Sequence, residues 1–404
     1  MLKSTNTLKI SQFFLFLTFF SILISTAFTN IFLLFSVLFG VLSIILSKNM
    51  LFLRYDKVSQ ISTLLFILLS FSLIYTITDT PEALETLKKY AKLTYIPVIY
   101  FILKDKYIKD RCVNYFLVGC SVILFLSYAK YFEFIQPTVI TYYLDIEYQE
   151  KLTHGVTIFQ NSIIHGAVLS LFSYLMLFKF FKNNSFLYLI ISSLGFYNVI
   201  FLNNSRSAYI ISIILIFFSI FKFIKNKNTK ILITAFLGII LFAGILNSKL
   251  IQHRISAAVT EIEYLQNNEY NNSVGLRLLW IKIGIHNILN SPILGSGVGS
   301  FKETSFNYFI DNEYDAKVNY SEAITKNSHN EFISISTQLG LVGLFLYILF
   351  LIYLFVYSLG SDFGGAVFII VSVSSIFNSL FFDNMLGIFI ILIIALGINK
   401  DQSN

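Results

Sequence analysis

Apolar runs of near-spanning length follow one another along almost the whole chain. Of the 404 residues, 56% are hydrophobic and only 13% are charged, whereas soluble domains carry about 25% charged residues. A run of about 20 apolar residues predicts a transmembrane helix. The sequence therefore predicts an all-α polytopic membrane protein with about 12 transmembrane helices. We expect residues 1–404 to form a single integral membrane domain.

The apolar runs alternate with two kinds of loop. Every second loop carries lysine or arginine, which are enriched in cytoplasmic loops. This pattern predicts cytoplasmic termini, and the net charge of +7 then reflects topology rather than nucleic-acid binding. The other loops face outward, and two of them are long: roughly 133–156 and 248–328. The apolar runs lie near 10–28, 31–47, 58–77, 81–103, 112–132, 157–181, 185–203, 206–224, 230–247, 329–357, 362–380 and 384–398.

The residue content disfavours several classes of chemistry. The two cysteines, Cys112 and Cys120, lie in or beside one apolar run and indicate neither a disulfide framework nor a zinc site. The chain has few histidines and no H-E-x-x-H pattern, so we expect no metal and no other cofactor. It has no Walker-type glycine-rich loop, so ATP is not the expected energy source. The first apolar run has no small-residue cleavage site, and we expect no cleavable signal peptide.

The long outer loop contains helical patterns. Apolar residues in 249–266 recur along one stripe, which predicts an amphipathic helix lying on the membrane. A second helix is expected from its cap at Ser273 through Asn290, where Ser291-Pro292 ends it. Three glycines then predict a tight loop, and a third short helix follows. The glycines are Gly295, Gly297 and Gly299.

The segment 327–331 closes this loop. Ser328 and Glu331 have the spacing of a capping box in front of an apolar run, which predicts that His329 lies in the first turn of an outward-facing helix end. The positive end of a helix dipole disfavours an imidazolium ion, so His329 is expected to be neutral, as a general base must be. The alternative is a histidine that is simply one more polar residue at the surface.

Two arginines are candidate anion-binding residues. Arg206 begins an apolar run on the outer side. A cation there is disfavoured by the positive end of the helix dipole, and arginine is uncommon in outward-facing loops. A bound anion would compensate for both effects. The alternative is an arginine that reaches the lipid headgroups. Arg277, three residues before Trp280, can bind phosphate in a bidentate manner, or can rest on anionic lipid at the interface.

Two lysines are further candidates. Thr80-Pro81 starts a helix in which Lys89 has Glu85 as a supporting partner. Lys88 and Lys92 share another face without such a partner and could bind a second phosphate group, although a solvated helix end explains them as well. Of the other histidines, His165 is expected to make a buried hydrogen bond.

Five segments, in this order, resemble the O-antigen ligase and polymerase family of bacterial envelope glycosyltransferases. The resemblance covers about 200–355, which we expect to be the catalytic region, with 248–328 as a large periplasmic loop. The segments are Asn203-Asn204-Ser205-Arg206-Ser207-Ala208, Gly275-Leu276-Arg277-Leu278-Leu279-Trp280, Ser291-Pro292-Ile293-Leu294-Gly295-Ser296-Gly297, Asn327-Ser328-His329-Asn330-Glu331 and Leu339-Gly340-Leu341-Val342-Gly343.

The resemblance implies a reaction, a location and partners. Such enzymes lie in the bacterial inner membrane and take a glycan from undecaprenyl pyrophosphate on its periplasmic side. Ligases transfer the glycan to a sugar hydroxyl of lipid A-core, with inversion and without a metal, and polymerases transfer it to another lipid-linked repeat unit. The expected partners are this donor, lipid A-core or another glycan acceptor, and membrane lipids, but no nucleic acid.

A mechanism follows as an expectation. Arg206 and Arg277 bind the pyrophosphate, and His329 takes the proton of the attacking hydroxyl or only positions the acceptor. The residues expected to bind substrate are Lys88, Lys92, Asn327 and Trp280.

Ligase is the first assignment, because the modest 133–156 loop is shorter than the second large outer loop of many such polymerases. Polymerase is the alternative, a ligase that glycosylates protein is a third member of the same family, and a lipid or glycan transporter is the alternative of another class.

Overall fold

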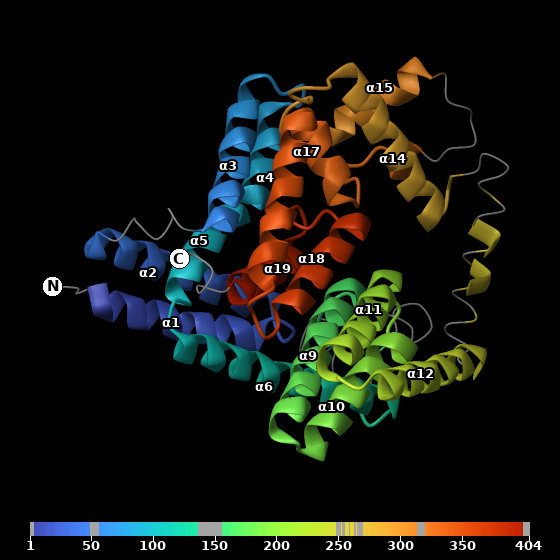
Figure 1. Cartoon of the computed structure of the whole chain (residues 1–404). Helices are drawn as coiled ribbons and strands as arrows, with labels where there is room; N and C mark the ends of the chain where they lie inside the picture. Colours follow the sequence, from blue (N-terminus) through green and yellow to red (C-terminus); the bar gives the residue numbers. More distant parts are fainter. Residues whose placement is uncertain are drawn as a thin grey trace. The chain divides into compact units, whose positions relative to one another are not determined.

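A computed structural model of the chain describes residues 4–48, 56–135, 156–247, 270–312 and 320–398, with a few positions between 252 and 264. Throughout these residues the regular structure is helical, without strands (Figure 1), so the predicted all-α class is confirmed. The chain divides into two compact units. The first unit is Met1–Asn49, Phe101–His253 and Asp362–Ile370, and the second is Met50–Tyr100, Arg254–Ser361 and Val371–Asn404.

Within the described residues, six helices are long and apolar enough to cross a membrane. The chain is therefore a membrane protein with several apolar helices, whereas the count of about twelve spans stays a prediction. The six are Thr26–Ser47, Lys57–Ile74, Lys106–Tyr131, Ser162–Asn183, Arg206–Phe223 and Glu331–Ser358, and the shorter apolar helices are Phe186–Leu202, Gly364–Phe377 and Asn384–Gly397.

The first unit is a set of packed helices. In it α1 packs against α2 and α6, and α9 packs against α10 and α11 (Figure 1). Ser11 and Ser36 join α1 to α2 because each hydroxyl donates to the other residue's carbonyl oxygen, at 2.7 and 3.0 Å. The helices are α1 (Ser4–Ser21), α2 (Thr26–Ser47), α6 (Lys106–Tyr131), α9 (Ser162–Asn183), α10 (Phe186–Tyr197), the π-helical turn η4 (Asn198–Leu202), α11 (Arg206–Phe223) and α12 (Lys227–Asn247).

A buried chain of hydrogen bonds holds Asn198, the first residue of η4, which precedes the segment that contains Arg206. The Asn198 amide donates to Ser127 Oγ at 2.8 Å, and Ser127 Oγ donates to the Val156 carbonyl. Asn198 Oδ1 therefore faces His165 Nε2 at 3.1 Å, which makes that nitrogen the donor. His165 is 1% exposed, so the predicted buried hydrogen bond is confirmed.

The second unit is built around α17. Both α3 and α14 pack against this helix, and α15 packs against α14 (Figure 1). The elements are α3 (Lys57–Phe71), η2 (Ser72–Ile74), α4 (Thr80–Tyr90), η3 (Ala91–Thr94), α5 (Tyr95–Ile102), α14 (Ser273–Asn290), α15 (Phe301–Asp311), α16 (Tyr320–Ala323), α17 (Glu331–Ser358), α18 (Gly364–Phe377), whose first part belongs to the first unit, and α19 (Asn384–Gly397).

The apolar run at 81–103 is not one helix. It is divided into α4, η3 and α5. The 3₁₀ turn has fewer residues per turn than an α-helix, so it rotates the side chains that follow Tyr90 to a different face. The prediction of a continuous span over this run is therefore wrong.

The outer-loop predictions have different outcomes. The helix from residue 273 to 290 is confirmed, but its cap is Asn272, whose side chain accepts from the Gly275 amide, and not Ser273. Asparagine and serine cap equally well, so the sequence did not distinguish these neighbours. A short helix, α15, follows the glycine loop as expected. The amphipathic helix expected at 249–266 lies largely outside the described residues, as does most of the 133–156 loop.

Helices α14, α15 and α16 enclose an apolar core. Trp280 and Ile283 of α14 pack with Phe301 and Phe309 of α15 and with Ala323 of α16. All of these side chains are less than a tenth exposed. The core fixes α14 and the segment after α16, and these two elements carry the candidate site.

Candidate functional site

Two glycine-containing segments of the second unit interlock. The loop after α14 lies against a break in α17, where Gly340 has non-helical torsions of φ 61° and ψ −155°. The Ser296 and Gly297 amides donate to the carbonyls of Thr337 and Gln338 at 2.8 and 3.0 Å. In return, the Leu341 amide donates to the Pro292 carbonyl at 2.8 Å. The loop therefore satisfies the backbone groups that the break leaves unpaired.

The glycines allow this close approach. Gly295 and Gly340 both have positive φ, and a Cβ on Gly340 would overlap the carbonyl group of Ile293. A third glycine, Gly299, donates its amide to Gln338 Oε1 at 3.1 Å. Two of the segments that carry the family resemblance are thus the two halves of one structural unit at the break in α17.

His329 lies immediately before α17. The helix begins at Glu331, and its cap is Asn330, whose side chain accepts from the Ile333 amide. His329 has a positive φ of 50°, so it is outside the helix. Its amide donates to Asn327 Oδ1 at 2.9 Å, which forms a tight turn that presents the imidazole.

The predicted capping box is therefore wrong. Ser328 donates its hydroxyl to the Asn330 carbonyl at 2.8 Å instead of capping the helix. Glu331 is 0% exposed and accepts from the Phe381 amide at 3.3 Å. Asn330, two residues after Ser328, caps a helix as well as serine does. The helix therefore starts two residues later than predicted.

The imidazole of His329 stacks on Trp280. Their ring centroids are 5.0 Å apart with an interplanar angle of 29°. Trp280 is itself held in place because its Nε1 donates to the Ala323 carbonyl at 3.0 Å. One face of the partly exposed imidazole is thus covered by a fixed aromatic ring, which restricts its orientation.

The charge state of His329 is set by its surroundings. Burial lowers the pKa of His329 below its usual value, and the positive charge of Arg277 lowers the pKa further, against a smaller opposing effect of Asp383. Arg277 is three residues before Trp280 on α14 and so lies on the same helix face. The imidazole is therefore neutral at pH 7 and can accept a proton.

An ion-pair network holds the segment before His329. The Lys326 ammonium lies 3.3 Å from carboxylate oxygens of Glu82 and Glu85 on α4. Lys302 of α15 lies 3.2 Å from Glu82, and the expected pair of Lys89 with Glu85 is present at 3.0 Å. Exposed pairs contribute little one by one, but a network that joins three elements restrains their relative positions. The sequence did not indicate the role of Lys326.

Asp79, Glu82 and Glu303 are the acidic groups of this region that lie close enough together to hold a metal ion, among the residues that the structure describes. Glu82 already pairs with Lys302 and Lys326, and Glu303 accepts from Thr78 Oγ1 at 2.9 Å. Because the lysines already neutralise Glu82, the donor set does not favour a cation.

The structure places the two predicted lysines differently. Lys88 is exposed on α4. Lys92 is 7% exposed, and its ammonium donates to the carbonyls of Asp383 and Asn384. It also interacts electrostatically with Glu331. The expectation that Lys92 has no partner is wrong, because the 3₁₀ turn after α4 directs it inward, and a role for it in phosphate binding stays a prediction that its burial does not favour.

Arg206 belongs to the first unit. It is the first residue of α11, and the cap is Ser205, whose side chain accepts from the Ala208 amide. The predicted position at the start of an apolar helix is confirmed. Arg206 is partly exposed, whereas Asn203, Asn204 and Ser205 before it are buried.

The second unit therefore brings together His329, Trp280, Arg277 and Asn327, all four of which were candidates from the sequence. Residues 187–348 match a family model described as O-antigen ligase. This segment is similar to the O-antigen ligase family. The match contains these four residues and Arg206, and it leaves out Lys88 and Lys92.

The family match confirms the resemblance found in the sequence. It implies an activity of the O-antigen ligase or polymerase type, with a lipid-linked glycan and an acceptor as the general partners. It also agrees with the several apolar helices of a membrane protein. No curated protein matches the chain.

Proposed function

We propose that this chain is an O-antigen ligase-type glycosyltransferase of the bacterial inner membrane. It transfers a glycan from undecaprenyl pyrophosphate to a sugar hydroxyl of lipid A-core at the periplasmic face, with inversion and without a metal. The observation that carries the proposal is the imidazole of His329, whose ring centroid lies 5.0 Å from that of Trp280. Burial and the positive charge of Arg277 both lower the pKa of this imidazole. A base beside a fixed cation suits a hydroxyl nucleophile and a pyrophosphate leaving group.

In the proposed mechanism, the acceptor hydroxyl donates its proton to His329 as its oxygen attacks the anomeric carbon. The bond from that carbon to the pyrophosphate oxygen breaks, and undecaprenyl pyrophosphate leaves. Arg277 stabilises the negative charge that develops on the leaving group. The phosphate-binding role expected of Arg206 from the sequence stays a prediction. Asn327 positions His329 through its hydrogen bond to the His329 amide, and Lys88 is the remaining exposed candidate for a phosphate contact.

Polymerase activity is the second candidate within the same chemistry. The donor and the leaving group are unchanged, and only the acceptor differs. The site residues act on the donor and on any hydroxyl, so they serve either acceptor. The ligase assignment rests on the modest length of the 133–156 loop.

Complementation separates these candidates. The wild-type chain is expressed in a strain that lacks its own O-antigen ligase, and the lipopolysaccharide is separated on a gel. The proposal predicts that an O-antigen ladder on lipid A-core is restored. If the ladder returns only in a polymerase-deficient strain, the chain is a polymerase, and if neither strain responds although the protein is abundant, both assignments are wrong.

Replacement of Arg277 by glutamine is expected to change the pH dependence of transfer. His329 acts as a base only when neutral, so the rate is full above its pKa and is lost as the pH falls through that value. Arg277 lowers the pKa of His329, so its removal raises this pKa and moves the acid limb of the rate profile to higher pH. Rate profiles of purified wild type and variant measure the shift.

A control for this shift is Lys282→Gln on the same helix. The Lys282 ammonium donates to the Tyr270 hydroxyl at 2.6 Å, and residues two apart, such as Lys282 and Trp280, lie on different faces of a helix. Its acid limb is expected to stay at the wild-type position. Arg277→Lys keeps the charge and is expected to keep the limb close to its original pH. An unmoved limb in Arg277→Gln would show that His329 is not the titrating base.

Replacement of Trp280 is expected to show how much the stacked ring contributes to the rate of glycan transfer. Trp280→Phe keeps an aromatic ring beneath His329, whereas Trp280→Leu does not, and aromatic contacts of this kind contribute about 0.5–1.5 kcal/mol. Trp280→Leu is therefore expected to transfer glycan about 2- to 10-fold more slowly than Trp280→Phe. Both variants lose the hydrogen bond to the Ala323 carbonyl, so a comparison of the two corrects for it, and equal rates would mean that the stacking has no part in transfer.

A further inference from the structure

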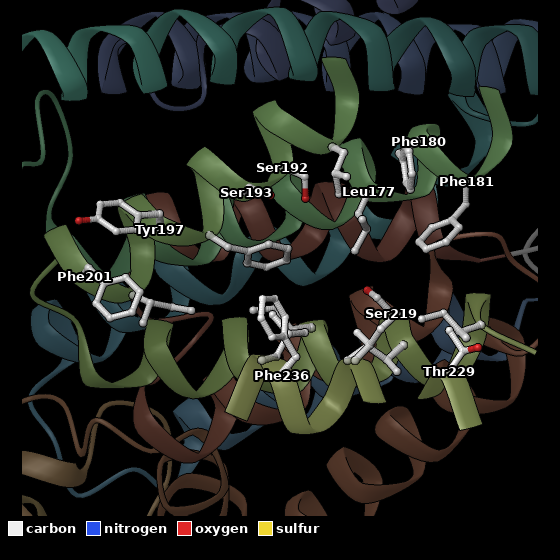
Figure 2. A pocket seen from close by; sticks show the side chains of 18 residues that line it. Leu177, Phe180, Phe181, Ser192, Ser193, Tyr197, Phe201, Ser219, Thr229 and Phe236 are labelled. Carbon is white, nitrogen blue, oxygen red and sulfur yellow. The ribbon is translucent and has the colours of Figure 1, made fainter. Parts of the chain in front are cut away.

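The first unit contains an apolar cavity of ≈ 770 Å³. Its walls come from α9, α10, α11 and α12, and in Figure 2 side chains of two opposed layers of helices point into it. Phe180, Phe181, Phe196, Phe201 and Phe236 contribute much of the lining. Water gains few hydrogen bonds in such a space, and an empty cavity would leave these rings without contact atoms. Hydrocarbon is therefore the expected content.

The cavity is long in one direction. Its lining runs along α10 and the following π-helical turn from Leu189 to Phe201, a stretch of about 18 Å at 1.5 Å per residue. One leaflet contributes about half of the ~30 Å hydrocarbon thickness of a bilayer. The cavity therefore has the length of a single lipid chain that lies within one leaflet.

One end of the cavity is bordered by lysines. The ends of α9 and α11 meet there, since the Phe181 and Phe223 rings stack at 4.8 Å. The lining residues Phe181, Ile224 and Thr229 each have a lysine as the next residue. The lysines of this end are Lys179, Lys182, Lys222, Lys225, Lys227 and Lys230.

This end has a marked excess of positive charge. The sequence from Lys179 to Lys230 contains no aspartate or glutamate. Asp362 interacts electrostatically with Lys222, whose ammonium also donates to the Asp362 carbonyl. Lys225 and Lys227 are exposed, so they are free to approach an anion at the membrane surface. Basic residues at the cytoplasmic end of membrane helices attract anionic lipid headgroups.

We propose that this cavity binds an anionic phospholipid, with one acyl chain between α10 and α12 and the phosphate against Lys225 and Lys227. The apolar lining matches the chain, and the lysines match the charge of the headgroup. The lipid is distinct from the glycan donor of the proposed function. Arg206 and Lys222 are at opposite ends of α11, about 24 Å apart at 1.5 Å per residue, so a pyrophosphate at Arg206 cannot contact these lysines.

Lipid titration of the purified full-length protein tests this site. Phosphatidylglycerol is titrated into the delipidated protein, and bound lipid is counted by native mass spectrometry, with phosphatidylcholine and a polyprenyl phosphate as the other probes. Phosphatidylglycerol is expected to bind more tightly than either. Lys225→Gln combined with Lys227→Gln is expected to weaken it by about 5- to 30-fold, because each lysine near a membrane surface adds an attraction of about 1 kcal/mol.

Two further variants locate the lipid. Ser193 is exposed and lines the cavity, so Ser193→Phe fills the space without removing a buried group, and it is expected to reduce phosphatidylglycerol binding. Lys9→Gln combined with Lys106→Gln removes two exposed lysines of the same unit away from the cavity and is expected to leave binding unchanged. Equal binding of phosphatidylcholine, preferential binding of the polyprenyl phosphate, or an unchanged affinity in the Lys225 and Lys227 double variant would overturn the proposal.

Discussion

Replacement of His329 by alanine is expected to lower the rate of glycan transfer by about 10²–10⁴, the usual contribution of a general base. The imidazole is neutral because burial and Arg277 lower its pKa, and its ring is held by Trp280. The side chain is only partly buried and lies outside α17, so its loss is expected to leave the fold intact. Single-turnover rates with a lipid-linked glycan and an acceptor measure the effect.

His286→Ala is the matched control. His286 is also a partly exposed histidine of the second unit, and its ring also contacts an aromatic ring, that of Tyr308 at 5.2 Å. It is expected to retain the wild-type rate. A His329→Ala enzyme with less than a tenfold loss would show that His329 positions the acceptor without taking its proton.

Replacement of Gly340 by alanine is expected to have the largest effect on stability. The torsions of Gly340 (φ 61°, ψ −155°) belong to a region that residues with a Cβ rarely adopt, at a cost of about 1–3 kcal/mol. The added Cβ would also overlap the Ile293 carbonyl, which forces the interlocked segments apart and costs about another 1–3 kcal/mol. Thermal unfolding in detergent, followed by size-exclusion chromatography, is expected to show a markedly lower midpoint.

Gly238→Ala provides the comparison, because a Cβ at Gly238 in α12 meets no atom within 4 Å. Alanine favours a helix over glycine by up to about 1 kcal/mol, so this variant is expected to be as stable as the wild type or slightly more so. If the two variants unfolded at the same temperature, the loop would not depend on the break in α17.

Local signals in the sequence predicted several elements and positions correctly. The proline after Thr80 and the proline after Ser291 mark where α4 begins and where α14 has ended, because proline restricts the backbone irrespective of its surroundings. Arg206 at the start of α11 followed from hydropathy alone. The tight loop at Gly295, Gly297 and Gly299, which all have positive φ in the structure, followed from the clustering of these glycines next to a helix end.

Features that depend on distant partners were not predictable. The inward position of Lys92 depends on carbonyls of Asp383 and Asn384, about 290 positions further along the sequence. The interlock of the glycine loop with α17 depends on backbone groups that become neighbours only when both segments fold. The choice of Asn330 rather than Ser328 as the cap depends on where Ser328 finds other partners, including Ser334 at 2.8 Å.

The candidate site also combines features that local sequence signals predict with features that depend on distant partners. The sequence nominated His329, Arg277, Trp280 and Asn327 separately, through their residue types and the family resemblance. Their assembly came from the apolar core of α14, α15 and α16, which sets Trp280 beneath His329. The electrostatic influence of Arg277 on the His329 pKa then followed from the helix spacing of Arg277 and Trp280.

The most direct test of the proposed function is transfer by the purified full-length protein. The protein is incubated with an undecaprenyl-pyrophosphate-linked glycan and lipid A-core, and both the glycosylated lipid A-core and the released undecaprenyl pyrophosphate are quantified by mass spectrometry. The proposal predicts equal amounts of the two products with wild type and His286→Ala, and a loss of both with His329→Ala. Joined repeat units on the lipid carrier in place of glycosylated lipid A-core, or undiminished transfer by His329→Ala, would contradict it.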